Sequence, residues 1–142
     1  IGGGFMIKHE YAELSDKKAG IIKSITAVTK GTAGGYVLLI ICFAVLALVY
    51  TYTSFPAGML KPFVTGITAL SLIFCGILTA RSIDFFGWLH GVFAGILYTV
   101  IRYIFGAVFL NGFGFNTATL SMFLLGIVLG AAGGILGINF KK

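Results

Sequence analysis

Apolar residues dominate the chain after Gly31, where charged side chains occur at only six positions. Five of these charges stand at the ends of long apolar stretches: Lys61, Arg81, Asp84, Lys141 and Lys142. The sixth, Arg102, lies inside such a stretch. A helical run of about 20 apolar residues has the length of the ~30 Å hydrocarbon layer of a bilayer. The pattern therefore predicts an all-α integral membrane protein, built as a bundle of four transmembrane helices.

We expect the spans at about residues 33–54, 63–80, 88–109 and 118–138, in one transmembrane domain of residues 33–142. Asn116 or Thr117 is expected to cap the last helix, because both side chains can accept a backbone N–H. The second and fourth spans end in similar residues, Gly76–Ala80 and Gly134–Ile138. This similarity favours two helical hairpins in parallel repeat. Chance is the alternative explanation, since Gly, Ile and Leu are abundant here.

The residues before the first span form a separate segment. Residues 1–5 precede Met6 and are expected to be a non-native remnant. Residues 6–32 are expected to be a cytoplasmic N-terminal arm. Four apolar residues of this arm recur near helical spacing: Leu14, Ile21, Ile25 and Val28. The spacing favours an amphipathic helix on the anionic inner leaflet. The alternative is a solvated or frayed lead-in, because Gly20 weakens a helix.

Composition and charge agree with a membrane protein. The hydrophobic fraction is 58%, the charged fraction is 10% and the mean hydropathy is +1.06, unlike a soluble domain. The chain of 142 residues leaves no room for a second domain. The net charge of +6 comes from residues beside the spans and not from one basic face. We therefore expect contact with the lipid bilayer and no nucleic-acid partner.

Lysine and arginine are distributed unevenly between the two sides of the predicted spans. Eight lie in the arm, the second loop and the C-terminal tail, whereas Lys61 alone lies on the opposite side. Short loops rich in these residues stay in the cytoplasm. We therefore expect a multi-pass protein of the cell membrane with both termini in the cytoplasm.

Glycines recur at four-residue intervals in two spans: Gly87, Gly91 and Gly95 in the third, and Gly126, Gly130 and Gly134 in the fourth. Such spacing lets two helices approach backbone to backbone. We interpret these glycines as helix-packing positions, against other helices of the chain, a second copy or a partner protein. The alternative is that they open a path for a small solute or a lipid chain.

Arg102 lies on the same helical face as the glycines of the third span, so we expect it to point toward protein and not lipid. It is 15 residues after Gly87, or ~22 Å along the helix, which places it in the outer half of the membrane. A structural arginine that snorkels to water is one interpretation. The other is an anion or lipid-headgroup contact in a vestibule with Tyr98, Tyr103 and Asn111.

Arg81, Asp84 and His90 lie close together in the sequence at the predicted cytoplasmic side. They could form a polar cluster, since histidine titrates near neutral pH. In the simpler alternative His90 is only hydrogen-bonded, and Asp84 caps the positive end of the third helix.

Several chemistries lack the residues that they need. No Asp or Glu lies within a predicted span, which argues against coupled cation transport. Cys42 and Cys75 lie in different spans without neighbouring ligands, so we expect no metal site and no cofactor. No Ser–His–Asp set, zinc motif or phosphate loop is present. We therefore do not expect an enzyme.

The run Gly87–Gly91, followed by Gly95–Tyr98, resembles the YrzE-like family of small four-span membrane proteins from Firmicutes. Arg81 and the glycine-rich segment Gly133–Gly137 resemble that family as well. The resemblance covers roughly residues 30 to 140 and implies a membrane location and a four-span topology. It implies no mechanism, and the longer N-terminal arm departs from the family's pattern.

Two functions remain open. The first is a non-catalytic subunit or scaffold that acts through glycine-mediated helix packing, with a membrane-protein partner or as a homo-oligomer. The second is a small channel, carrier or lipid- or anion-binding protein that uses Arg102 in an outer-leaflet vestibule, with a bound lipid as one ligand.

Overall fold

The computed structural model describes residues 2–84, 86–110 and 112–141. Its helices are α1 (Gly2–Tyr52), the short 3₁₀ helix η1 (Ala57–Met59), α2 (Leu60–Arg81), α3 (Gly87–Phe109) and α4 (Thr117–Asn139). The four α-helices are long and apolar enough to cross a membrane, and the described residues contain no strand. The predicted fold class is therefore confirmed. The Asn116 side chain accepts the Thr117 N–H at 2.8 Å, so Asn116 caps α4 as predicted.

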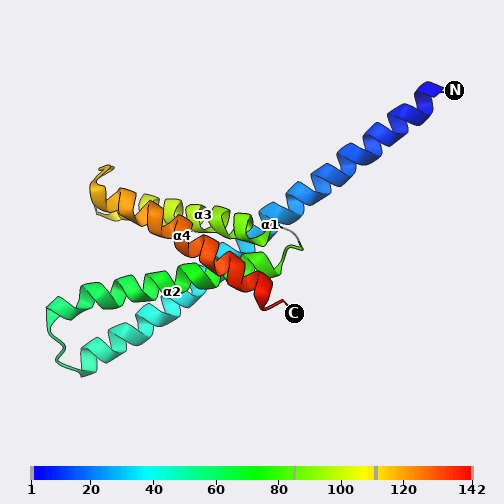
Figure 1. The fold of residues 1–142 in the computed structure, drawn as a ribbon. Coiled ribbons are helices and arrows are strands. Elements are labelled where there is room, and N and C mark those ends of the chain that lie inside the picture. Colours follow the sequence, from blue (N-terminus) through cyan, green and yellow to red (C-terminus); the bar gives the residue numbers. More distant parts are fainter. Residues whose placement is uncertain (1, 85, 111, 142) are drawn as a thin grey trace.

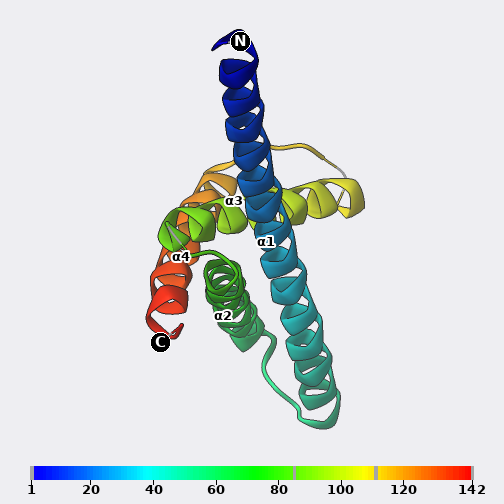
Figure 2. The ribbon, with the colours of Figure 1, turned by 90° about the vertical axis from the view of Figure 1, so that its right-hand side faces the viewer.

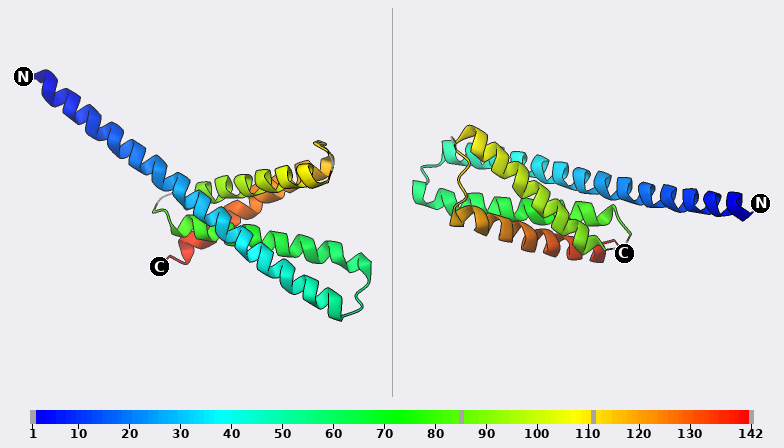
Figure 3. Two further views of the ribbon diagram at one scale, coloured as in Figure 1. Left: turned by 180° about the vertical axis from the view of Figure 1, so that it is seen from behind. Right: turned by 90° about the horizontal axis from the view of Figure 1, so that it is seen from above.

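The α-helices form two antiparallel hairpins (Figure 1). One pairs the C-terminal half of α1 with α2, and the other pairs α3 with α4. The hairpins converge where the C-terminus and the α2–α3 connection lie, which we call the terminus end (Figure 3). They diverge toward the connections of residues 53–59 and 110–116, which we call the loop end. Whether the two hairpins are an internal repeat stays a prediction.

The N-terminal arm continues the axis of the first span. The helix α1 has 51 residues, or ~76 Å, more than twice the thickness of the hydrocarbon layer. Its first part projects beyond the other helices, whereas α2 lies beside its C-terminal half (Figure 2). Residues 2–22 are exposed, and Gly20 does not interrupt the helix. In the structure the arm is therefore a continuous part of α1, and its place on the inner leaflet stays a prediction.

The packed part of α1 begins earlier than the predicted start of the first span at Ala33. Ala27 and Gly31 are already buried, and Ser24 reaches α3. Where the first membrane span begins stays a prediction. Lys23 and Lys30 are exposed in this stretch, and Lys23 reaches Asp84 on the α2–α3 connection.

The glycines of α3 and α4 meet one another directly. A Cβ atom on Gly130 would lie 2.5 Å from the Gly91 carbonyl oxygen, and one on Gly134 would lie 2.7 Å from that of Gly87. A Cβ on Gly95 would collide with the Gly126 carbonyl oxygen. All six glycines singled out in the sequence therefore lie at this α3–α4 contact. Side chains larger than hydrogen would separate the two backbones.

Glycines also close the other contacts of the bundle. In the α2–α4 contact, a Cβ on Gly76 would lie 3.0 Å from the Gly133 Cα. In the α1–α2 contact, a Cβ on Gly35 would lie 2.8 Å from the Cys75 Cβ. We call these three contacts the glycine seams. The glycine seams lie within one chain, whereas Gly66 and Gly106 have no atom within 4 Å of a Cβ.

A buried hydrogen-bond network joins the two hairpins. The Tyr36 hydroxyl donates to the Tyr98 carbonyl oxygen at 2.9 Å, and the two rings stack with centroids 4.5 Å apart. The Tyr98 hydroxyl donates to Ser71 Oγ at 3.2 Å, and the Ser71 hydroxyl donates to the Gly35 carbonyl oxygen. Tyr98 and Ser71 are fully buried. The network satisfies polar groups that burial would otherwise penalise.

The seams predict which glycines tolerate a methyl group. We expect Gly95→Ala and Gly130→Ala each to destabilise the protein by about 1–3 kcal/mol, the usual range for overpacking. Gly106→Ala on α3 is the control, because no atom lies within 4 Å of a Cβ there and alanine favours a helix. Thermal melting in detergent measures the difference. Equal melting temperatures for all three variants would contradict the packing described.

Candidate functional site

Arg102 lies inside α3, whereas Lys61 and Arg81, the other charged residues of α2, α3 and α4, lie at the ends of α2. It stands seven residues before the end of α3 at Phe109, or ~10 Å from the loop end of that helix. The residue is half-buried and makes no hydrogen bond or ion pair with any described residue. No Asp or Glu lies in α2, α3 or α4 to match it. An unpaired charge at this depth is costly in an apolar medium.

Two cavities meet at Arg102. The loop-side cavity has a volume of about 320 Å³ and lies between α3, α4 and their connection. The deep cavity has a volume of about 240 Å³ and extends from Arg102 toward the middle of the bundle, between α2, α3 and α4. Thr99, Arg102 and Met122 line both cavities. The guanidinium group therefore stands at the junction of a shallow and a deeper space.

The hydroxyl groups around the deep cavity already donate their hydrogen bonds. Thr68, Thr99 and Ser121 each donate to the backbone carbonyl four residues earlier, at 2.8 to 2.9 Å. Thr65 does the same at 3.0 Å. Their oxygen atoms can still accept a hydrogen bond. Among the described polar groups that line this cavity, the Arg102 guanidinium is the donor without a partner.

The predicted vestibule residues occupy different places. Tyr98 is fully buried and lines the deep cavity. Its hydroxyl is bound to Ser71. Tyr103 lines the loop-side cavity, and its ring lies 6.0 to 6.4 Å from three phenylalanine rings. Asn111 lies outside the described residues. Tyr98 thus lines the cavity on the terminus-end side of Arg102, and Tyr103 lines the cavity on its loop-end side.

Four hydroxyl residues of the deep cavity were missed in the sequence: Thr65, Thr68, Thr99 and Ser121. Thr65 and Thr68 are three residues apart, so they share a face of α2. That spacing could have indicated a polar stripe, but nothing in the sequence pairs the stripe with Arg102. Ser121 carries no local signal, because only the packing of α4 on α2 brings it to this cavity.

The predicted cluster of Arg81, Asp84 and His90 does not form as expected. Asp84 pairs instead with Lys141 at 2.5 Å and with Lys23 at 3.4 Å. No hydrogen bond or ion pair joins Arg81 to a described residue. No described hydrogen bond or ion pair joins these three residues to one another, because the partners of Asp84 come from α1 and from the segment after α4. Sequence proximity does not reveal those contacts.

His90 bonds to two groups near the arm. Its Nδ1 lies 2.9 Å from the Phe86 carbonyl oxygen, and its Nε2 lies 3.0 Å from Ser24 Oγ. The ring thereby links the start of α3 to α1. Asp84 does not cap α3, because the residue at the N-cap position is Phe86.

The ion pairs of Asp84 perturb its ionisation. The hydrogen bond from Lys141 and the charges of Lys141 and Lys23 lower the pKa of this carboxyl below its ordinary value. Lys141 also donates to the Ile83 carbonyl oxygen at 3.2 Å. The α2–α3 connection is thus bound electrostatically to α1 and to the C-terminal segment.

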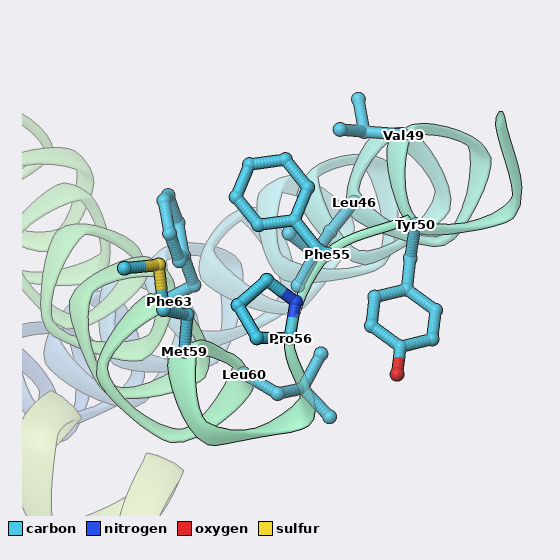
Figure 4. A pocket seen from close by; sticks show the side chains of 8 residues that line it. All are labelled: Leu46, Val49, Tyr50, Phe55, Pro56, Met59, Leu60 and Phe63. Atoms are coloured by element: carbon cyan, nitrogen blue, oxygen red, sulfur yellow. The ribbon is translucent and has the colours of Figure 1, made fainter. Parts of the chain in front are cut away.

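Two further hollows have almost wholly apolar linings. One of about 60 Å³ lies at the tip of the first hairpin, where Phe55 and Pro56 face Met59 and Phe63 (Figure 4). A groove of about 480 Å³ lies between α1 and α3, with His90 and Ser24 at its terminus end. Neither is lined by a charged residue, so neither offers the unpaired charge that distinguishes Arg102.

The pairing of Asp84 predicts a pH-dependent stability. A folded-state pKa below the unfolded value stabilises the fold above the ordinary carboxyl pKa of about 3.9, and this contribution is lost as pH falls through the lowered pKa. We therefore expect Asp84→Asn to lower the melting temperature at pH 7 and to matter progressively less below about pH 4. Asp16→Asn, an exposed arm carboxyl without a described ion pair, is the control. An effect of Asp84→Asn that is the same at pH 7 and pH 3 would contradict this account.

Comparison with known proteins gives one match. A family model described as "Protein of unknown function (DUF3792)" matches residues 24–137. No curated protein and no solved structure matches the chain. The match begins where α1 first contacts α3, so the arm of residues 2–22 lies outside it. The narrower resemblance to the YrzE-like proteins of Firmicutes stays a prediction. Because the match covers most of the four-helix bundle, the chain belongs to the DUF3792 family.

Proposed function

We propose that this membrane protein binds an anionic group at Arg102 and performs no catalysis. The observation that carries the proposal is that Arg102, half-buried where two cavities meet, has no hydrogen-bond or ion-pair partner among the residues that the structure describes. A phosphate or carboxylate supplies the acceptor oxygens that such a group prefers. The anion is either free in water or the headgroup of a lipid, since both offer the same chemistry to Arg102.

The charge distribution supports an outer-leaflet site. If the basic terminus end faces the cytoplasm, the loop end faces outward. Arg102 then lies ~10 Å below the outer end of α3. A lipid phosphate is within reach of an arginine that extends toward the membrane surface. An aqueous anion reaches the same group through the loop-side cavity.

Binding fits the cavities better than passage. The deep cavity ends at Leu72 and Tyr98, which are 4% and 0% exposed. These side chains stand between the cavity and the terminus end of the bundle. A channel or carrier for the anion would have to break the Tyr36–Tyr98–Ser71 network to continue.

The linings also favour a non-catalytic role. None of the described residues that line the two cavities is a His, Cys, Asp, Glu or Lys. Tyr98 and Tyr103 are the lining residues that could act as a general acid or base, and the Tyr98 hydroxyl is already bound to Ser71. The scaffold hypothesis loses the support of the glycines, because the seams use them within the chain. A partner or a second copy would have to contact other surfaces.

The chain contains only two arginines, Arg81 and Arg102, which makes the proposal directly measurable. In protein labelled with ¹⁵N-arginine, the Arg102 side-chain resonance should shift when inorganic phosphate or an anionic phospholipid is added. The Arg81 resonance serves as an internal reference. A shift confined to Arg81, or no shift at all, would contradict the proposal.

Substitution gives the matching energetic test. We expect Arg102→Leu to insert into the membrane normally but to lose about 1.5–3 kcal/mol of anion binding, the usual value of a charged hydrogen bond. Lys61→Leu removes another cation of the loop end and is the matched control. Equilibrium titration of the purified variants in detergent compares them. Equal affinity of wild type and Arg102→Leu would show that Arg102 does not hold the anion.

A further inference from the structure

We infer that the ligand of Arg102 is an anionic amphiphile with a single acyl chain, whose charged head binds the guanidinium while its chain occupies the deep cavity. This inference rests on the proposed function and specifies its ligand. It commits to a lipid-type molecule, such as a lysophospholipid, over a free anion.

The two cavities differ in what they can hold. Beyond Arg102 the deep cavity is lined by aliphatic groups of Ala69, Leu72, Leu125 and Leu129. The cavity is open at the surface of the bundle, since Met122 and Leu125 in its lining are 44% and 48% exposed, so an acyl chain anchored at Arg102 can enter it from the leaflet. Apolar cavities of ~150 Å³ already take up a ligand the size of benzene. The deep cavity is larger, at about 240 Å³, and so suits an apolar chain.

The volume indicates one chain. A water molecule takes a share of ~30 Å³ in the liquid, so the deep cavity has room for about eight such volumes. A short run of methylene groups from one chain fills a space of this order, so the remainder of a full-length chain such as oleoyl lies outside the cavity in the bilayer, and two chains side by side do not fit.

The hydroxyl oxygens around Arg102 add a second element of recognition. Thr65, Thr68 and Ser121 keep lone pairs, because their protons are bound to backbone carbonyls. These oxygens can accept hydrogen bonds from a ligand hydroxyl, such as that of the glycerol in a lysophospholipid. A polar rim beside a cation, with an aliphatic space beyond it, matches a molecule whose head and chain are joined by glycerol.

The position between the hairpins allows such a molecule to enter. The deep cavity lies between α2 of the first hairpin and α4 of the second. The hairpins diverge toward the loop end (Figure 3). An amphiphile moving in the leaflet can therefore place its chain in the deep cavity while the glycine seams stay in contact.

Three probes separate the parts of the ligand. Oleoyl lysophosphatidic acid has both parts, sn-glycerol 3-phosphate has the head alone, and monooleoylglycerol has the chain without the charge. With ¹⁵N-arginine protein in non-ionic detergent, we expect lysophosphatidic acid to shift the Arg102 resonance at concentrations at least tenfold lower than either other probe. Equal potency of glycerol 3-phosphate and lysophosphatidic acid would overturn the inference and leave the proposed function standing.

A cavity-filling variant tests the place of the chain. Ala69→Leu adds three carbon atoms to the lining of the deep cavity, and Ala44→Leu makes the same change at an exposed position of α1 that lines neither cavity. We expect Ala69→Leu to weaken lysophosphatidic acid binding about tenfold, with glycerol 3-phosphate binding unchanged. Ala44→Leu should bind both as wild type does. An unchanged affinity of Ala69→Leu for lysophosphatidic acid would overturn the inference.

Two readouts keep the outcomes distinguishable. The response of Ala69→Leu to glycerol 3-phosphate and its melting temperature show whether the variant is folded. If Ala69→Leu is unfolded, Ala69→Val makes a smaller change in the same cavity lining. We expect Ala69→Val also to weaken lysophosphatidic acid binding and to leave glycerol 3-phosphate binding unchanged. Failure of the proposed function would look different, since the Arg102 resonance would then respond to none of the anionic probes.

Discussion

The contact of α4 with both α2 and α3, backbone against backbone, is the constraint on which the rest of the structure depends. Gly130 and Gly134 face α3, whereas Gly133 and Gly137 face α2. One helix is thus held on two sides by positions that accept no side chain. In a bilayer, where burial of apolar surface gives helices little reason to associate, close packing of this kind supplies the attraction.

The geometry of the seams determines where the cavities lie. The hairpins meet at the terminus end and separate toward the loop end, so the space between them opens where Arg102 stands. At the terminus end, Asp84 balances two lysines across the α2–α3 connection. No carboxylate balances Arg102 at the loop end. The proposed anion completes a charge pair that the protein itself leaves incomplete.

The sequence predicted some of these features and could not predict others. Hydropathy located the helices because a span has a required length, but it could not indicate that packing in α1 already begins at Ala27, where lysines and buried residues share one turn. Four-residue spacing identified the glycines and the face of Arg102. It could not reveal that these glycines meet inside one chain. The partners of Asp84 and the contribution of Ser121 depend on contacts between distant segments, which periodicity does not encode.

The most direct test of the account is a cross-link across one glycine seam. Across the α1–α2 seam the Cys75 sulfur lies 3.9 Å from the Thr32 hydroxyl oxygen, so a cysteine at position 32 is placed close to the native thiol without replacing a seam glycine. In a chain whose Cys42 is replaced by serine, Thr32→Cys should oxidise in membranes with the native Cys75 to a monomer containing an internal disulfide. Covalent dimers as the main product, with no internal disulfide, would show that the seam joins two copies and would contradict the account.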